Sequence, residues 1–218
     1  MNVDHAANRT LPRPGGRRWG RRMLLAIGTL AGLLAAADGL WWSGWRVNLT
    51  ESEPLGFYRL AAIGPSTVIR RGALIEFCPP PSVTPARFPF YMKGNCPGGG
   101  MPMFKQVAGV PGDRIDASLN GVSVNGRLLP YSAQLARSAT WPRLQLPHQA
   151  RVFVLRAGHY WVYGSGAKPM LAAESFDSRY WGGVTRTQVR RVGPAGPDPD
   201  SSLQQANVTR RSGRSASA

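Results

Sequence analysis

Ser52 lies in a polar stretch, residues 48–58, between two glutamates and two residues after Thr50. A serine in such a stretch is either a nucleophile or part of a plain loop that joins two elements. As a nucleophile it needs a base within hydrogen-bonding reach to take its proton. The chemistry therefore depends on which base elsewhere in the chain can reach this loop.

Lys105 is the first candidate for that base. It lies in the apolar segment 104–110, in a chain that takes nearly all its positive charge from arginine and has only two other lysines, Lys93 and Lys168. Burial lowers the pKa of a lysine, and a neutral amine acts as a general base, whereas arginine stays protonated. The spacing alone leaves open the alternative that Lys105 points into solvent from an edge strand.

Histidine is the alternative base. His159 lies in an aromatic segment and His148 in a proline-flanked loop, and either could form a Ser/His/Asp arrangement with Asp113 or Asp177. Neither histidine lies in a local motif, so a structural imidazole is the favoured interpretation of both. The histidines and the two cysteines do not have the spacing of a zinc site, so we expect no metal and no cofactor.

The elements that must position these residues begin with a membrane segment. Residues 23–42 are almost wholly apolar and end in tryptophans, with arginines before them. This pattern predicts a transmembrane helix whose N-terminal side faces the cytoplasm. A cleavable signal peptide is the alternative, because three alanines at 35–37 resemble a cleavage site. Both interpretations place the rest of the chain outside the cytoplasm.

The distribution of charge along the 218-residue chain agrees with a membrane segment followed by an exported domain. The formal net charge is +16, which favours nucleic acid or an anionic membrane as a partner. The arginines, however, gather before the apolar segment and in the tail, and no basic stripe carries interleaved aromatic residues, so nucleic acid is not expected. We predict a disordered cytoplasmic tail at 1–22, an exported domain at 43–195 and a disordered tail at 196–218.

The exported domain has the pattern of a mostly antiparallel β domain. Strands are expected within 67–77 and 104–110, and 151–155 and 159–163 are expected to form a strand pair. Asn-Gly pairs at 120–121 and 125–126 predict hairpin turns. The stretches 82–103 and 130–150 are expected to be long loops on this framework. In an exported domain, Cys78 and Cys96 are expected to form a disulfide.

Three motifs together resemble those of the conjugative-transfer signal peptidases of the TraF type, relatives of the bacterial type I signal peptidases. The motifs are Asn48-x-Thr50-x-Ser52-x-Pro54-x-Gly56-x-Tyr58, the box from Lys105 to Pro-Gly-Asp113, and Ser175-x-Asp177-Ser-Arg179-Tyr-Trp-Gly182. The resemblance implies a mainly β fold of the signal-peptidase/LexA-like type with one N-terminal transmembrane helix.

The resemblance also implies roles for the residues that match. Ser52 is the nucleophile, Lys105 the general base, and Thr50 contributes its hydroxyl to the oxyanion hole. Ser175 orients the lysine, while Asp177, Arg179 and Asp113 give structural support. General signal peptidases carry Gly-Asp-Asn before the third motif, and this chain has Gly-Ser-Gly-Ala-Lys at 164–168.

The expected function is a serine endopeptidase, anchored in the inner membrane with its catalytic domain in the periplasm. Its substrate would be a pilin-like precursor, and contacts with the conjugative transfer apparatus are implied. Two alternatives stay open: a general type I signal peptidase, and a non-catalytic β scaffold of the transfer apparatus. The sequence leaves undecided whether water or an amine resolves the acyl-enzyme.

Overall fold

The structure is a computed structural model that describes residues 16–164 and 174–195. The chain divides into two units, Met1–Ser43 and Gly44–Ala218. The sequence-based expectation for 196–218, and for most of the N-terminal tail, lies outside the described residues.

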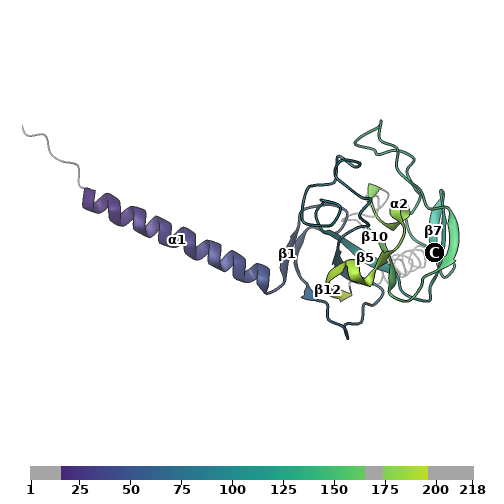
Figure 1. The fold of residues 1–218 in the computed structure, drawn as a ribbon, viewed down its shortest axis with the longest axis horizontal. Coiled ribbons are helices and arrows are strands. Elements are labelled where there is room, and N and C mark those ends of the chain that lie inside the picture. The colour runs from purple at the N-terminus through teal and green to yellow at the C-terminus, as the bar shows by residue number, and fades with distance from the viewer. Residues whose placement is uncertain (1–15, 165–173, 196–218) are drawn as a thin grey trace, which may run out of the picture. The chain divides into compact units, whose positions relative to one another are not determined.

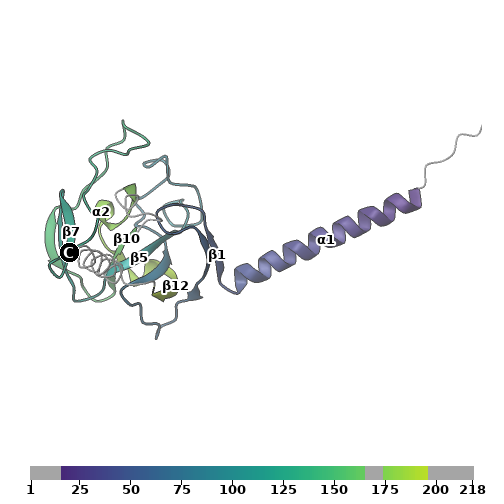
Figure 2. The ribbon, with the colours of Figure 1, turned by 180° about the vertical axis from the view of Figure 1, so that it is seen from behind.

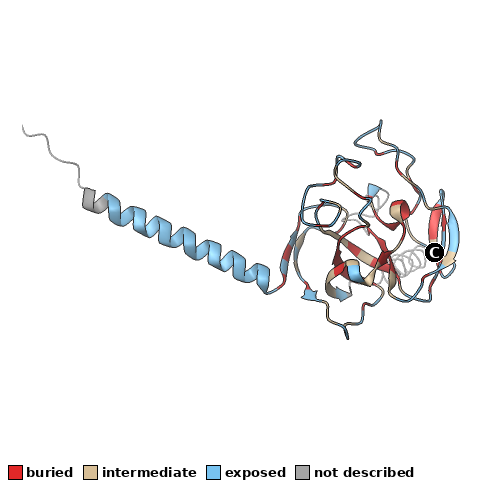
Figure 3. Cartoon of the chain, in the orientation of Figure 1, coloured by how far each residue is buried: buried red, intermediate tan, exposed pale blue. Residues whose placement is uncertain are grey.

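The described part of the N-terminal unit, from residue 16 onward, contains the helix α1, Gly16–Trp42. It is a single unbroken helix, and its described side chains are exposed (Figures 1 and 3). The stretch Trp19–Trp42 is long and apolar enough to cross a membrane, as an anchor or a signal sequence does. The helix begins at Gly16, so the expectation of a tail running to residue 22 was wrong at its end. Arginine is a good helix former and no proline lies within Gly16–Trp42, so the helix can include the arginines before residue 23.

The second unit is built from three antiparallel sheets, and β1 and β7 lie at opposite ends of it (Figures 1 and 2). A two-stranded sheet pairs β1 (Trp45–Asn48) with β2 (Gly56–Arg59). The six-stranded sheet has the order β11 (Val184–Thr185), β10 (His159–Tyr163), β5 (Met103–Gly109), β4 (Ala73–Phe77), β12 (Val189–Ala195) and β3 (Ala61–Ala62). The four-stranded sheet has the order β8 (Arg127–Leu128), β7 (Gly121–Val124), β6 (Arg114–Ser118) and β9 (Arg151–Val154).

The mainly antiparallel β fold expected from the sequence is confirmed. The hairpin at 125–126 forms as predicted, with positive φ at Asn125 (52°) and Gly126 (82°) between β7 and β8. The other hairpin also forms, but Ser118 pairs with Gly121, so its turn residues are 119 and 120 rather than the Asn-Gly pair.

Two strand predictions were wrong in part. Residues 67–70 are not a strand, and β4 begins only at Ala73, after the turn at Gly72. The segments β9 and β10 are both strands but do not pair with each other. Strand β9 pairs with β6, and β10 pairs with β5 and β11. Alternating apolar residues mark a strand, whereas its partner is chosen by long-range packing that the local pattern does not contain.

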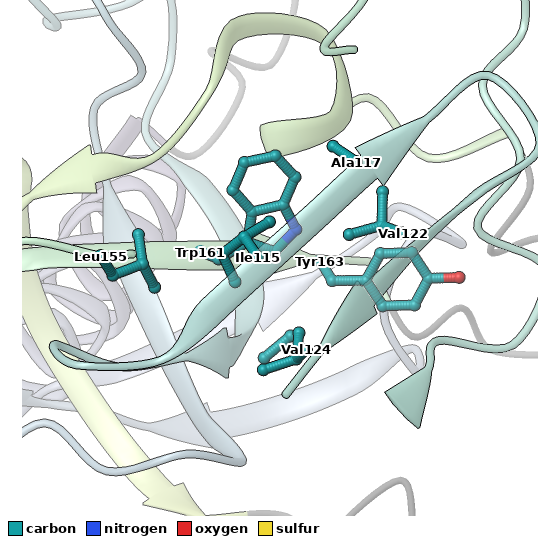
Figure 4. Close-up of a cluster of buried hydrophobic side chains, with 8 residues drawn as sticks. Ile115, Ala117, Val122, Val124, Leu155, Trp161 and Tyr163 are labelled. Carbon is teal, nitrogen blue, oxygen red and sulfur yellow. The ribbon is translucent and has the colours of Figure 1, made fainter. Parts of the chain in front are cut away.

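The core lies on both faces of the six-stranded sheet. One cluster packs the four-stranded sheet against β5 and β10, and Figure 4 shows its central side chains: Ile115, Ala117, Val122, Val124, Leu155, Trp161 and Tyr163. A second cluster, which includes Ile75, Phe77, Val107 and Val162, covers the other face. Burial of these apolar side chains fixes β5 in the middle of the domain.

The expected disulfide is confirmed. Cys78 and Cys96 are bonded and close a loop with a sequence separation of 18. Such a cross-link stabilises a fold by about 3 kcal/mol in the chain-entropy description. The loop carries Phe90, Tyr91 and Met92, and it therefore restrains the residues that form one wall of the cavity described below.

Candidate active site

The loop that carries Ser52 is held by Asn48, the last residue of β1. The buried Asn48 side chain donates through Nδ2 to the carbonyl oxygens of Thr50 (2.9 Å), Glu53 (2.9 Å) and Pro54 (3.0 Å). Its Oδ1 accepts from the Thr50 amide at 3.2 Å. Because β1 and β2 pair up to Asn48 and Gly56, these bonds close the loop around one side chain and fix the position of Ser52.

Ser52 is half-buried and contacts Thr50, with 3.3 Å between the two hydroxyl oxygens. The Thr50 hydroxyl also donates to Asn48 Oδ1 at 2.9 Å. A hydroxyl has one proton to give, so in this arrangement Ser52 is the donor to Thr50. The Ser52 O–H must therefore rotate away from Thr50 before a base can take its proton. The Thr50 O–H must likewise rotate away from Asn48 before it can donate to an oxyanion.

Lys105 lies on β5, an interior strand between β10 and β4, and is only 4% exposed. The alternative of a solvated lysine on an edge strand was therefore wrong. Burial lowers the pKa of Lys105 from its ordinary value. The charges of Glu53 and Asp177 oppose this shift and Arg179 adds to it, and the pKa remains lowered. A lowered pKa favours the neutral amine that a general base needs.

One cavity of about 400 Å³ brings the sequence-predicted residues together. Thr50, Ser52, Lys105 and Ser175 all line it. They come from the β1–β2 loop, from β5 and from the segment before α2 (Ser178–Trp181). Most of the remaining wall is apolar, and its aromatic and methionine side chains are Phe90, Tyr91, Met92, Met101, Met103, Phe104, Phe176 and Tyr180.

Ser175 is 3% exposed, and its Oγ has no hydrogen-bond partner among the residues that the structure describes. A buried hydroxyl without a partner is costly, which makes it a candidate to bond a moving group such as an amine. Its place is set from one side by Gly164, because a Cβ built there would lie 1.9 Å from Ser175 Oγ and 3.1 Å from the Ser52 carbonyl oxygen.

Asp177 and Arg179 form a fully buried ion pair, with 2.9 Å between Arg179 Nε and Asp177 Oδ1. Asp177 caps α2 and also accepts from the Gly164 amide at 3.0 Å. Arg179 donates to the carbonyl of Ser175 at 2.7 Å. The pair therefore fixes Gly164 and also Ser175, which lines the cavity.

Asp113 lies away from this cavity. It accepts from Arg71 (2.7 Å), from the amide of Val110 (2.6 Å) and from Asn125 (2.8 Å), and so fixes the turn between β5 and β6. Neither His148 nor His159 lines the cavity, so the geometry does not support a Ser/His/Asp site. Within 16–164 and 174–195 no cluster of three acidic, histidine or cysteine side chains could hold a metal.

The family described as signal peptidase, peptidase S26, matches residues 18–195, a stretch that contains every residue of this site. The chain belongs to this signal peptidase family. The resemblance expected from the sequence is thereby confirmed.

Three curated relatives are named as plasmid or conjugal transfer proteins TraF. A plasmid transfer protein TraF of Escherichia coli is 35% identical over 77% of this chain and 90% of its own length. A conjugal transfer protein TraF of Agrobacterium tumefaciens is 32% identical, over 75% and 88% respectively. A probable conjugal transfer protein TraF of Sinorhizobium fredii is 40% identical over 56% of this chain, and the alignment spans 65% of that relative. A solved signal peptidase I of Enterococcus faecalis aligns over 59% of this chain and 98% of its own, at 22% identity and a TM-score of 0.33.

Three residues of this signal peptidase site had no role assigned from the sequence: Asn48, Glu53 and Gly164. Asn48 opens the first motif, and an asparagine just before a polar loop is a signal for a side chain that closes the loop. Glu53 and Gly164 gave no local signal, since their contacts are with residues far away in the sequence.

We expect Gly164→Ala to destabilise the domain by about 1–3 kcal/mol, because the new methyl group overpacks against Ser175. Gly64→Ala is the matched control, since its Cβ meets only Thr67 Oγ1, at 3.9 Å. Urea unfolding of the two variants measures the difference. Equal stabilities would show that Ser175 and Gly164 are not in the contact described.

Proposed function

We propose that this signal peptidase family member is a membrane-bound serine endopeptidase that matures a pilin-like precursor. The main support is that Ser52 and Lys105 line one cavity, although they are 53 residues apart in the sequence. Burial in this cavity lowers the pKa of the lysine. A serine beside a neutral lysine is a known arrangement for an activated nucleophile.

The proposed reaction begins when neutral Lys105 takes the proton of Ser52, whose oxygen attacks the scissile carbonyl. The Ser52 amide and the Thr50 hydroxyl, turned away from Asn48, donate to the oxyanion. The Lys105 ammonium then protonates the leaving amine, and an acyl-enzyme forms on Ser52. Water or another amine resolves it. Ser175 Oγ, which has no bond within the described part of the chain, accepts from the ammonium and orients it.

A role in plasmid transfer is supported by the relatives, which are named as plasmid or conjugal transfer proteins, and the pilin-like substrate is what the resemblance of the three motifs implies. We place the domain at the periplasmic face of the inner membrane. Support comes from apolar side chains exposed on the β1–β2 hairpin around Ser52, a surface suited to the membrane interface. They are Trp45, Val47, Leu49, Leu55 and Phe57.

The test is cleavage by the full-length protein in detergent, offered a pilin-like precursor and an ordinary secretory precursor. We expect the pilin-like precursor to be cut, and Ser52→Ala to remove that cleavage. Cleavage of the secretory precursor with comparable efficiency would favour a general signal peptidase. No cleavage of either, or cleavage that survives Ser52→Ala, would favour the scaffold or another nucleophile and would overturn the proposal.

A further inference from the structure

The residue after Ser52 is a buried acid that the mechanism above does not use. Glu53 is 2% exposed, whereas Glu51, on the other side of Ser52, is exposed. A carboxylate in a loop beside solvent has no reason to be buried unless specific bonds hold it, since burial removes its hydration. Its burial is therefore a feature of the site that needs a reason.

The bonds of Glu53 join the two halves of the site. Its Oε1 accepts from the backbone amide of Gln106 at 3.2 Å, and its own carbonyl accepts from Asn48. The residue that follows the nucleophile is thus bonded to the residue that follows the base. This bond ties the β1–β2 loop to β5, two segments more than 50 residues apart in the sequence.

The charge of Glu53 acts on the same lysine. Desolvation lowers the pKa of Lys105, and among the charged groups that raise this pKa Glu53 contributes most, ahead of Asp177. Asp177 is bonded to Arg179, and those two charges act on Lys105 in opposite directions. Tyr58 and Tyr163 also face this region. Burial raises the pKa of both phenols, and the Glu53 charge adds to the rise for Tyr58 and, after that of Asp177, for Tyr163. They therefore stay neutral and add no charge.

We propose that Glu53 is a positioning residue of the Ser52–Lys105 site. Its carboxylate holds the Ser52 loop on β5, and its charge stabilises the ammonium that forms when Lys105 takes the Ser52 proton. In that step the Ser52 O–H bond breaks and the Lys105 N–H bond forms, so a neutral amine becomes a cation next to a fixed anion. This inference rests on the proposed function.

Glu53→Gln separates the two roles. The amide oxygen can still accept from the Gln106 amide, but the charge is gone, so the pKa of Lys105 should fall further. Glu53→Ala removes both the bond and the charge. The matched control is Glu51→Gln, which removes an exposed charge from the other neighbour of Ser52.

The first measurement needs no substrate. The chain has three lysines, so NMR of ¹³C-lysine-labelled full-length protein in detergent, in a Lys93→Arg/Lys168→Arg background, reports on Lys105 alone. We expect Glu53→Gln to move the Lys105 titration to lower pH and Glu51→Gln to leave it in place. An unmoved titration in Glu53→Gln overturns the electrostatic role, whether or not the protein cleaves a pilin.

The second measurement is the pH profile of cleavage of the pilin-like precursor. We expect Glu53→Gln to move the acid limb to lower pH, and Glu53→Ala to lower kcat by about 10- to 100-fold with a smaller change in KM, as misplacement of reacting groups does. If both variants keep wild-type kcat and profile while Ser52→Ala is inactive, the inference fails and the proposed function stands. If Glu53→Ala does not fold, Glu53→Gln decides the question alone.

Discussion

Lys105→Arg lowers kcat for pilin-precursor cleavage by about 10²–10⁴-fold, the range that a general base contributes. Arginine is a similar long, basic side chain, but its guanidinium stays protonated in proteins and cannot take the Ser52 proton. The measurement is the steady-state rate of cleavage by the full-length protein as a function of precursor concentration. KM should change less, because the substituted group acts in the transition state.

Lys93→Arg is the matched control, because Lys93 is exposed and does not line the cavity. It should leave kcat unchanged. The pH profile of the wild-type protein gives a second test. The base works when it is neutral, so cleavage activity should rise as the pH rises through the pKa of Lys105. Because burial lowers that pKa, the rise should come at lower pH than for a solvated lysine. Full activity of Lys105→Arg would exclude Lys105 as the base.

Asp177→Ala destabilises the domain by about 3–5 kcal/mol, the cost of leaving a buried charge without its partner. Arg179 is fully buried and would lose its ion pair, while Gly164 would lose an acceptor for its amide and α2 its cap. Thermal or urea unfolding measures the loss. Asp116→Ala is the matched control, since Asp116 is exposed on β6, and it should stay within about 0.5 kcal/mol of the wild type.

A double substitution separates the cost of an unpaired Arg179 from the cost of the other bonds that Asp177 makes. If the main cost is the unpaired guanidinium, Asp177→Ala/Arg179→Met should be more stable than Asp177→Ala alone, because an apolar side chain leaves no charge buried. A wild-type stability for Asp177→Ala would contradict the buried geometry of this pair.

Much of the site was predictable because its parts are local in sequence. Thr50 and Ser52 lie in one loop, and Asp177 and Arg179 lie two residues apart at the start of α2, so short motifs contain their contacts. The hairpin at Asn125-Gly126 was predictable for the same reason, since a two-residue turn fixes the pairing of its own strands. The apolar run of α1 likewise needs no tertiary information.

The partner of each strand was not predictable in this way. The segments β9 and β10 follow each other and look like a hairpin, yet the core places them in different sheets. The side chain of Trp161 on β10 packs in the same cluster as Ile115 on β6 (Figure 4). The free energy gained by burying such large apolar groups outweighs the lower entropic cost of pairing two strands that a short loop connects.

The sequence by itself determined which residues could do chemistry: one serine in a polar loop, one lysine in an apolar strand, and motifs that resemble those of a known family. Only the tertiary structure decided that β5 is interior and its lysine buried, because edge and interior strands share one local pattern. It alone also decided that Glu53 binds the strand of Lys105 and that Gly164 leaves room for Ser175. Those contacts join distant segments, and they exist only once the core has brought the segments together.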